Sequence, residues 1–155
     1  MRCDLQPMLH LDDGFDLRPA GASDAAPIAL WMAQPHIRRW WHQDWSVERW
    51  AQELEQQAAG VHSVPCVVAV DAEELGFVEL YRVRHDRLAE YYSSGEHDRG
   101  LHLAIGDITR VGRGLGRRLI RAVADGLLRA DPACERVVAE PDVQNTPSEI
   151  GRAHV

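Results

Sequence analysis

Alternating glycines and nearby arginines mark the stretch RVGRGLGRRL, residues 110–119. The glycines are Gly112, Gly114 and Gly116, and the arginines after the first of them are Arg113, Arg117 and Arg118. Glycine lets the backbone approach a ligand closely, and arginine offers forked donors to phosphate oxygens. A helical apolar pattern begins within this stretch. The first amides of a helix lack partners inside it and lie at the positive end of its dipole. The pattern predicts a pyrophosphate-binding turn.

Two common nucleotide-binding motifs do not fit this turn. All the basic residues of the chain are arginines, so a Walker A lysine and a Schiff-base lysine are excluded. In the GxGxxG fingerprint of Rossmann domains, counted from Gly112, Arg117 occupies the place of the last glycine. A glycine-rich loop that only turns the chain remains the alternative.

A histidine interrupts the apolar stretch GLHLAIGD, residues 100–107. Leu101, Leu103 and Ile105 alternate as in a half-buried strand, which places His102 on the opposite face beside Ala104. An imidazole has an ordinary pKa of about 6.5 and accepts protons near neutral pH, so His102 is a candidate base. A core histidine with a satisfied hydrogen bond is the alternative.

The elements that position these residues follow from apolar periodicity and turn residues. Strands are expected at 15–19, 65–70, 75–83, 100–105 and 136–140, and helices at about 24–33, 46–60 and 114–130. The strands 65–70 and 75–83 form an antiparallel hairpin, and 84–99 is a long loop or short helix. The order predicts a mixed α/β domain with a β-α-β unit in its C-terminal half.

Composition limits the class of protein. A chain of 155 residues suggests one domain, and a net charge of −7 argues against non-specific nucleic-acid binding. No apolar run approaches the roughly 20 residues of a membrane helix, and the N-terminus does not resemble a secretory signal. We therefore expect a cytoplasmic protein without a membrane partner. The three cysteines form no CxxC pair and the eight histidines no HExxH motif, so no metal is expected.

The chain resembles the GNAT acyltransferases, whose [Q/R]xxGxG turn binds the pyrophosphate of acyl-CoA. VGRGLG corresponds to that turn, with Val111 in the usual Gln/Arg position and Arg110 able to supply the lost contact. PHIRRWW, DWSVERW, ELY, EYY, DRGLHLAIGD, RGLG and EPDVQNT are similar to the siderophore-biosynthesis branch, whose members acylate lysine or hydroxylysine. The resemblance covers roughly residues 17–147.

The resemblance implies a single GNAT-type domain over residues 1–148. Its mixed central sheet would be flanked by helices, and its fourth and fifth strands, 100–105 and 136–140, would splay apart around the acyl-CoA donor. The implied donor contacts are Ile105, Arg110, Val111, Gly112, Arg113, Gly114, Leu115, Gly116 and Arg117. The implied catalytic pair is His102 and Asp142. Which of the two takes the proton is open.

An amine acceptor pocket is expected beside this pair, lined by Trp40, Trp41 and Tyr92 together with His102 and Asp142. Aromatic rings with polar tips suit a pocket wall, but the tryptophans suit a core equally well. Asp142 follows Pro141 and also fits a simple turn.

The C-terminal end departs from the family. The helix and two strands that follow the fifth strand in GNAT domains are expected to be missing. IGRAHV is what a common sequencing adapter encodes in one frame, so residues 149–155 are expected to be adapter read-through.

Three functions are compatible with the sequence. The first is transfer of an acyl group from acyl-CoA, or from an acyl carrier protein, to the side-chain amine of lysine or N-hydroxylysine. The second is acetylation of another small amine, as in aminoglycoside 6'-N-acetyltransferases. The third is a non-catalytic acyl-CoA-binding fragment.

Overall fold

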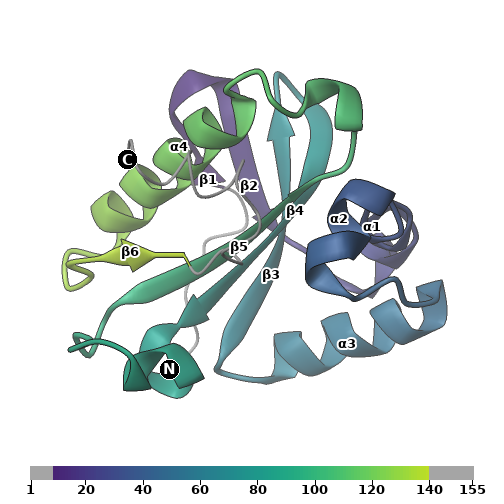
Figure 1. Cartoon of the computed structure of the whole chain (residues 1–155). Coiled ribbons are helices and arrows are strands. Elements are labelled where there is room, and N and C mark those ends of the chain that lie inside the picture. The colour runs from purple at the N-terminus through teal and green to yellow at the C-terminus, as the bar shows by residue number, and fades with distance from the viewer. Residues whose placement is uncertain (1–8, 140–155) are drawn as a thin grey trace.

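One six-stranded sheet runs through residues 9–139, the part of the chain that the computed structural model describes (Figure 1). Its strands, in spatial as well as chain order, are β1 (Leu9–His10), β2 (Phe15–Pro19), β3 (Ser63–Val70), β4 (Glu73–Arg82), β5 (Arg99–Ile105) and β6 (Val137–Val138). The helices are α1 (Ala25–Met32), α2 (Pro35–Trp41), α3 (Val47–Ala59) and α4 (Leu115–Ala130). The α/β class and the predicted strands and helices are confirmed, except where stated below.

Neighbouring strands are antiparallel except β5 and β6, which are parallel and joined through α4. The expected hairpin is β3–β4, and its turn is the pair Asp71 and Ala72 with φ angles of 49° and 67°. Two-residue turns with positive φ suit the twist of paired strands, and the predicted hairpin is confirmed.

The predicted β-α-β unit is also confirmed, because β5 and β6 are parallel neighbours and α4 lies between them in the chain.

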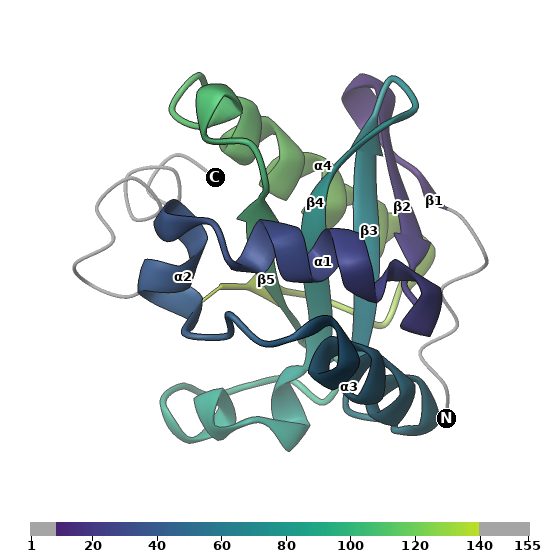
Figure 2. The same cartoon turned by 90° about the vertical axis from the view of Figure 1, so that its right-hand side faces the viewer.

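Helices cover both faces of the sheet: α1, α2 and α3 lie on one face and α4 on the other (Figures 1 and 2). Leu101 and Ile105 of β5 pack in the core under α4. Ala104 packs with Phe77 and Trp50 in the core under α1–α3. The alternation predicted for β5 is thus confirmed, and it places His102 on the α1–α3 face.

One expectation needs correction. Only two helices were expected between the first strand and the hairpin, but residues 35–41 form a third, α2, with Pro35 in its first turn. Its one buried residue is Ile37, so the segment carries no apolar stripe to reveal it. The 84–99 segment, expected as a long loop or short helix, is a loop with two short 3-10 helices, Val83–His85 and Arg87–Glu90, and β5 begins at its last residue, Arg99.

The last predicted features lie outside the described residues. They are Glu140 of the 136–140 strand, Asp142 and the 149–155 segment. Within residues 9–139, the parallel pairing of β5 with β6 covers Arg99 and Gly100 only. No helix in this part of the chain is long and apolar enough to cross a membrane.

The carboxylate of Asp98 organises the loop before β5. Asp98 is 1% exposed and accepts hydrogen bonds from the Tyr92 hydroxyl and the Gly95 amide, each at 2.9 Å. Arg136, just before β6, forms an ion pair with it at 3.1 Å. One buried side chain thus fastens the 84–98 loop to the strand at the sheet edge.

Candidate active site

The turn between β5 and α4 depends on two of its three glycines. Gly112 and Gly114 have φ angles of 82° and 78°, a region that side chains with a Cβ rarely adopt. A Cβ at either position would meet nothing within 4 Å among the described residues. These glycines are therefore needed for backbone conformation and leave open space beside the chain. Gly116 has neither property, since a Cβ there would make ordinary contact with Ile105 at 3.7 Å.

The backbone amides of this turn are available to a ligand. Gly114 is the N-cap of α4, and its carbonyl accepts a hydrogen bond from the Arg118 amide at 3.1 Å. No described residue accepts a hydrogen bond from the backbone amides of residues 112–117. Unpaired amides at the start of a 16-residue helix attract anions, because the helix dipole is positive there.

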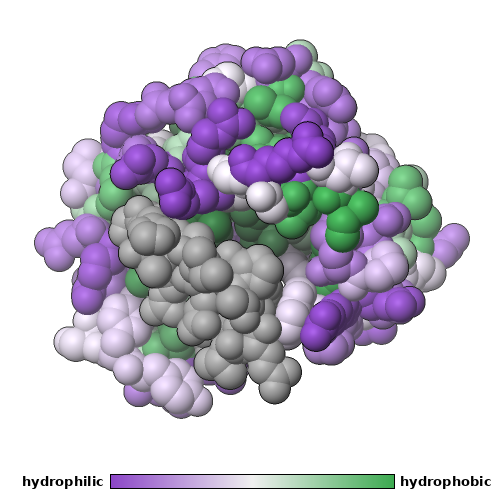
Figure 3. Space-filling model, turned by 45° about the horizontal axis from the view of Figure 1, so that its top comes forward, coloured by the Kyte–Doolittle hydropathy of each residue, from purple (hydrophilic) through white to green (hydrophobic). Residues whose placement is uncertain are grey.

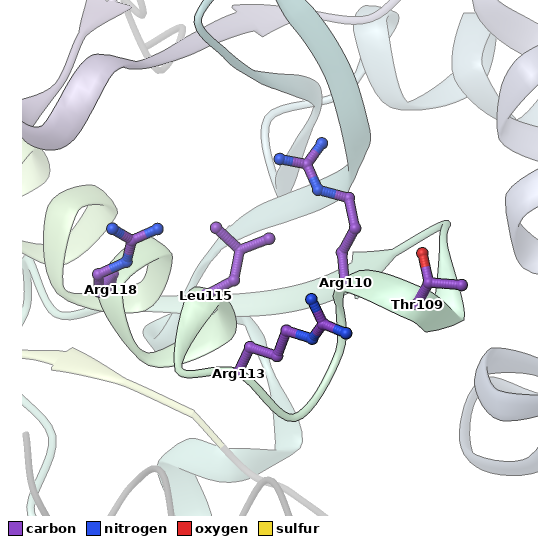
Figure 4. Close-up of a pocket in the computed structure, with 5 residues that line it drawn as sticks. All are labelled: Thr109, Arg110, Arg113, Leu115 and Arg118. Carbon is purple, nitrogen blue, oxygen red and sulfur yellow. The ribbon is translucent and has the colours of Figure 1, made fainter.

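Arginine side chains surround a hollow of about 390 Å³ at the same end of α4 (Figure 4). Its lining residues are Thr109, Arg110, Arg113, Leu115 and Arg118. Leu115 is buried, while Arg113 and Arg118 are exposed. Arg110 forms a loose ion pair with Glu73 at 3.7 Å. Figure 3 brings this end of the molecule forward and shows mainly hydrophilic residues across it.

The donor set fits a polyphosphate. Guanidinium groups and unpaired amides are all donors, and phosphate oxygens are strong acceptors. Arg110, Arg113 and Leu115 were among the predicted contacts. Thr109, which donates its hydroxyl and its amide to Asp107, was not foreseen as a lining residue. The predicted Arg117 and Val111 are exposed but are not among the residues that line the hollow.

On the α1–α3 face of the sheet, His102 is held in a layer of aromatic rings. Its imidazole stacks on Tyr81 with ring centres 4.9 Å apart and meets the edge of Trp41 at 5.6 Å. Trp41 in turn lies 5.8 Å from Phe77. His102 is half-buried, so it keeps access to solvent while its ring is fixed by neighbours from β4 and α2.

Glu79 lies directly across from His102 in the pairing of β4 with β5. Opposite residues of an antiparallel pair share a face, with Cβ atoms about 5 Å apart. Glu79 accepts a hydrogen bond from Gln57 Nε2 of α3 at 3.2 Å. Burial raises the pKa of Glu79 above its ordinary value, the Gln57 hydrogen bond opposes this, and Glu53 and Asp86 add to the rise. Sequence reasoning missed this carboxylate.

The other predicted acceptor residues are more dispersed. The guanidinium of Arg39 lies over the Trp40 ring at 4.8 Å. The Tyr92 hydroxyl donates to Asp98, and burial, together with this bond, raises the pKa of Tyr92 to about 12. Among the predicted acceptor residues that lie within 9–139, Trp41 is in contact with His102.

A hydrogen bond joins the two halves of the site. His36 Nε2, on α2, donates to the Ile105 carbonyl at the end of β5 across 2.8 Å. The Gly106 amide donates to the Leu75 carbonyl at 3.0 Å, which holds the start of the turn against β4. The helix that carries Trp41 is thereby attached to the strand that leads into the glycine turn.

Within residues 9–139, no group of three or more His, Cys, Asp or Glu side chains is placed to hold a metal ion. The chemistry that the described site can offer comes from donors to phosphate, an imidazole and a half-buried carboxylate.

Comparison with known proteins adds the family context. The family model for the acetyltransferase (GNAT) domain matches residues 21–149. Lysine N-acyltransferase MbtK of Mycolicibacterium paratuberculosis is 38% identical over 140 residues, which cover 90% of this chain and 63% of that protein. The N(6)-hydroxylysine O-acetyltransferase of Escherichia coli is 32% identical over 123 residues, which cover 79% of this chain and 39% of that protein. The chain thus spans less than two thirds of either relative.

Solved structures share the fold. An uncharacterized protein from Bacillus halodurans superposes with a TM-score of 0.81 and 26% identity, covering 90% of this chain and 72% of its own. Aminoglycoside acetyltransferase AAC(6')-Ib in complex with coenzyme A gives a TM-score of 0.78 at 22% identity, covering 90% and 81%. The curled sheet with helices on both faces is therefore the arrangement of known acetyltransferases.

Proposed function

Because the chain belongs to the GNAT acetyltransferase family, we propose that it is an N-acyltransferase that uses acyl-CoA as donor. The acceptor is the side-chain amine of lysine or N-hydroxylysine, as in the siderophore branch of the family. The observation that carries the proposal is the left-handed glycine turn at the start of α4, with its unpaired amides and surrounding arginines. The similarity to a lysine N-acyltransferase and a hydroxylysine acetyltransferase supports the acceptor class.

The donor binds at the turn. The pyrophosphate of acyl-CoA takes hydrogen bonds from the amides of residues 112–117 and charge from Arg110, Arg113 and Arg118. The acyl thioester then extends along β5 past Ile105 towards His102. An acyl carrier protein, which presents the same kind of thioester, is the alternative donor.

The reaction needs a neutral amine. A lysine side chain has a pKa of about 10.4 and is protonated at neutral pH, so it cannot attack. His102 accepts that proton, the nitrogen attacks the thioester carbonyl carbon, and the carbon–sulfur bond breaks with release of the thiolate, which is then protonated. Asp142, in the segment outside the described residues, is the proposed partner of His102 in this step.

Aromatic side chains confine the acceptor. Trp41 contacts both His102 and Phe77, which supports its role as one wall. Trp40 and Tyr92 are proposed to contact the aliphatic part of the acceptor further out. Such rings bury apolar surface and cost little conformational entropy.

A thiol-release assay tests the function. The chain is given acetyl-CoA, a long-chain acyl-CoA or an acylated carrier protein, with lysine, N-hydroxylysine or kanamycin as acceptor. We expect thiol release with lysine or N-hydroxylysine. Release with kanamycin alone would contradict the acceptor class, and CoA binding without release from any pair would contradict catalysis.

A further inference from the structure

A carboxylate beside His102 has no role in the reaction as described so far. Glu79 lies opposite His102 on the same face of the sheet. Its Oε2 accepts from Gln57 Nε2 at 3.2 Å, and no residue in the 9–139 range donates to its Oε1. One half of a partly buried carboxylate is therefore left for a donor that the described residues do not supply.

The neighbourhood of Glu79 has acceptors in excess. Gln57 Nε2 is shared, because it also donates to Glu53 at 2.9 Å. The other atom of that amide, Gln57 Oε1, is buried and has no donor among the described residues. Buried polar atoms are nearly always paired, so a bound molecule with several N–H donors suits this place. An alkylammonium group has three such donors.

The charges around Glu79 also favour a cationic ligand. Among the described residues, the ionised groups that act on Glu79 are two carboxylates, Glu53 of α3 and Asp86 of the loop after β4. A carboxylate taken partly out of water is costly unless a cation accompanies it. The described residues form no ion pair with Glu79. A protonated amine would supply the missing charge.

Resting on the proposed function, we propose that Glu79 binds the protonated amine of the acceptor beside His102. It thereby selects an alkylammonium acceptor such as lysine over N-hydroxylysine. A hydroxylamine is a much weaker base than an alkylamine and enters uncharged at neutral pH. Glu79 is a binding and specificity residue in this scheme, and the proton still leaves to His102.

Binding measurements test the proposal directly. Titration calorimetry compares L-lysine with norleucine, whose side chain is uncharged, for the unaltered chain, Glu79→Gln and Glu55→Gln. A hydrogen bond between charged groups corresponds to about a 10- to 100-fold preference. We expect that preference for lysine in the unaltered chain and in Glu55→Gln, an exposed site on α3. Glu79→Gln loses it and retains CoA binding, which shows that it folds.

Kinetics give a second readout. With acetyl-CoA, Glu79→Gln raises KM for lysine about tenfold or more while kcat changes less, and KM for N-hydroxylysine stays within about twofold. A lysine preference that survives Glu79→Gln, or that is absent from the unaltered chain, overturns the proposal. Lysine binding that depends on Glu79 without thiol release would contradict the proposed function alone. Normal turnover with unchanged KM in Glu79→Gln would contradict the role of Glu79 alone.

Discussion

His102 combines two properties that a proton acceptor needs. Tyr81 and Trp41 fix the plane of its ring, and its partial exposure leaves a route for an incoming amine. A core histidine would have only the first property. The position of the ring on the face away from α4 also separates it from the larger apolar core.

For His102→Gln we expect turnover to fall about 10²- to 10⁴-fold, the ordinary contribution of a general base. CoA affinity should stay unchanged, because the residues that line the proposed phosphate site, from Thr109 to Arg118, come after β5 and do not include His102. Thiol release and CoA calorimetry measure the two quantities. His97→Gln, at an exposed histidine of the loop, is the matched control. Unchanged turnover in His102→Gln would remove the imidazole from the mechanism.

Glu79→Gln should stabilise the folded chain at pH 7, because it removes a partly buried charge. The raised pKa of Glu79 means that this carboxyl group binds its proton more tightly in the folded state than in the unfolded state. The stability linked to that proton is present below the unfolded pKa and is lost as pH rises through the folded pKa. The difference in unfolding free energy between the variant and the unaltered chain should therefore vanish below about pH 4. Urea titrations at pH 4 and pH 7 measure it, and a destabilised variant at pH 7 would contradict the burial of this carboxylate.

Of the two polar side chains that face each other on this side of the sheet, the sequence revealed His102 and not Glu79. His102 stands out because a polar residue interrupts an apolar alternation. Glu79, in LGFVELYRV, looks like a solvent-facing residue of a half-buried strand. Only the position of α3, which brings Gln57 over that face, shows that the carboxylate is partly buried.

The turn before α4 has a conformation that lowers the stability of the folded chain but suits ligand binding. Two glycines in the left-handed region lose much backbone entropy on folding and fill no space in the chain. In return, the backbone amides of residues 112–117 have no acceptor among the described residues and can bind a ligand.

Gly112→Ala tests this element. A Cβ at φ 82° costs about 1–2 kcal/mol, although it would touch nothing. We expect weaker CoA binding, by about tenfold, with little change in the secondary structure seen by circular dichroism. Gly21→Ala is the control, since a Cβ there also meets nothing within 4 Å but φ is −129°. Equal CoA affinity for Gly112→Ala and the unaltered chain would show that the left-handed turn is not needed for donor binding.

Element prediction succeeded where periodicity was strong. The helix α4 has buried residues at regular helical spacing, and β3 and β4 are long apolar strands. It failed for α2, where two arginines and two tryptophans around a single buried isoleucine give no stripe. The two-residue strand β1 is too short to show alternation at all. The glycine turn was found from its composition, but which arginines line it depends on the direction of each side chain from the helix.

The molecule as a whole has two cores, one on each side of a single sheet. Both sides of the proposed reaction use that sheet: the phosphate site forms where β5 meets α4, and His102 and Glu79 lie on the opposite face from α4. Two of the connections in the sheet were accessible from sequence, the hairpin of β3 with β4 and the β-α-β unit of β5, α4 and β6. The burial of individual polar groups could not be predicted from the sequence, because it depends on residues that are distant in the chain.

Asp98 is the clearest case of such long-range dependence. For Asp98→Ala we expect the free energy of unfolding to fall by roughly 3 kcal/mol, because the hydroxyl, amide and guanidinium donors lose a buried acceptor. Glu96→Ala removes an exposed ion pair with Arg84 and should cost less than about 0.5 kcal/mol. Denaturant unfolding of both variants measures the difference. Similar losses for the two would show that the loop is not fastened through Asp98.

The bond between His36 and Ile105 has a mechanical consequence. It connects α2 to the last residue of β5, so an acceptor that displaces α2 together with Trp41 would also pull on the carbonyl beside the proposed thioester path. If the proposed function holds, we therefore expect variants that accept larger amines to bind the donor less well.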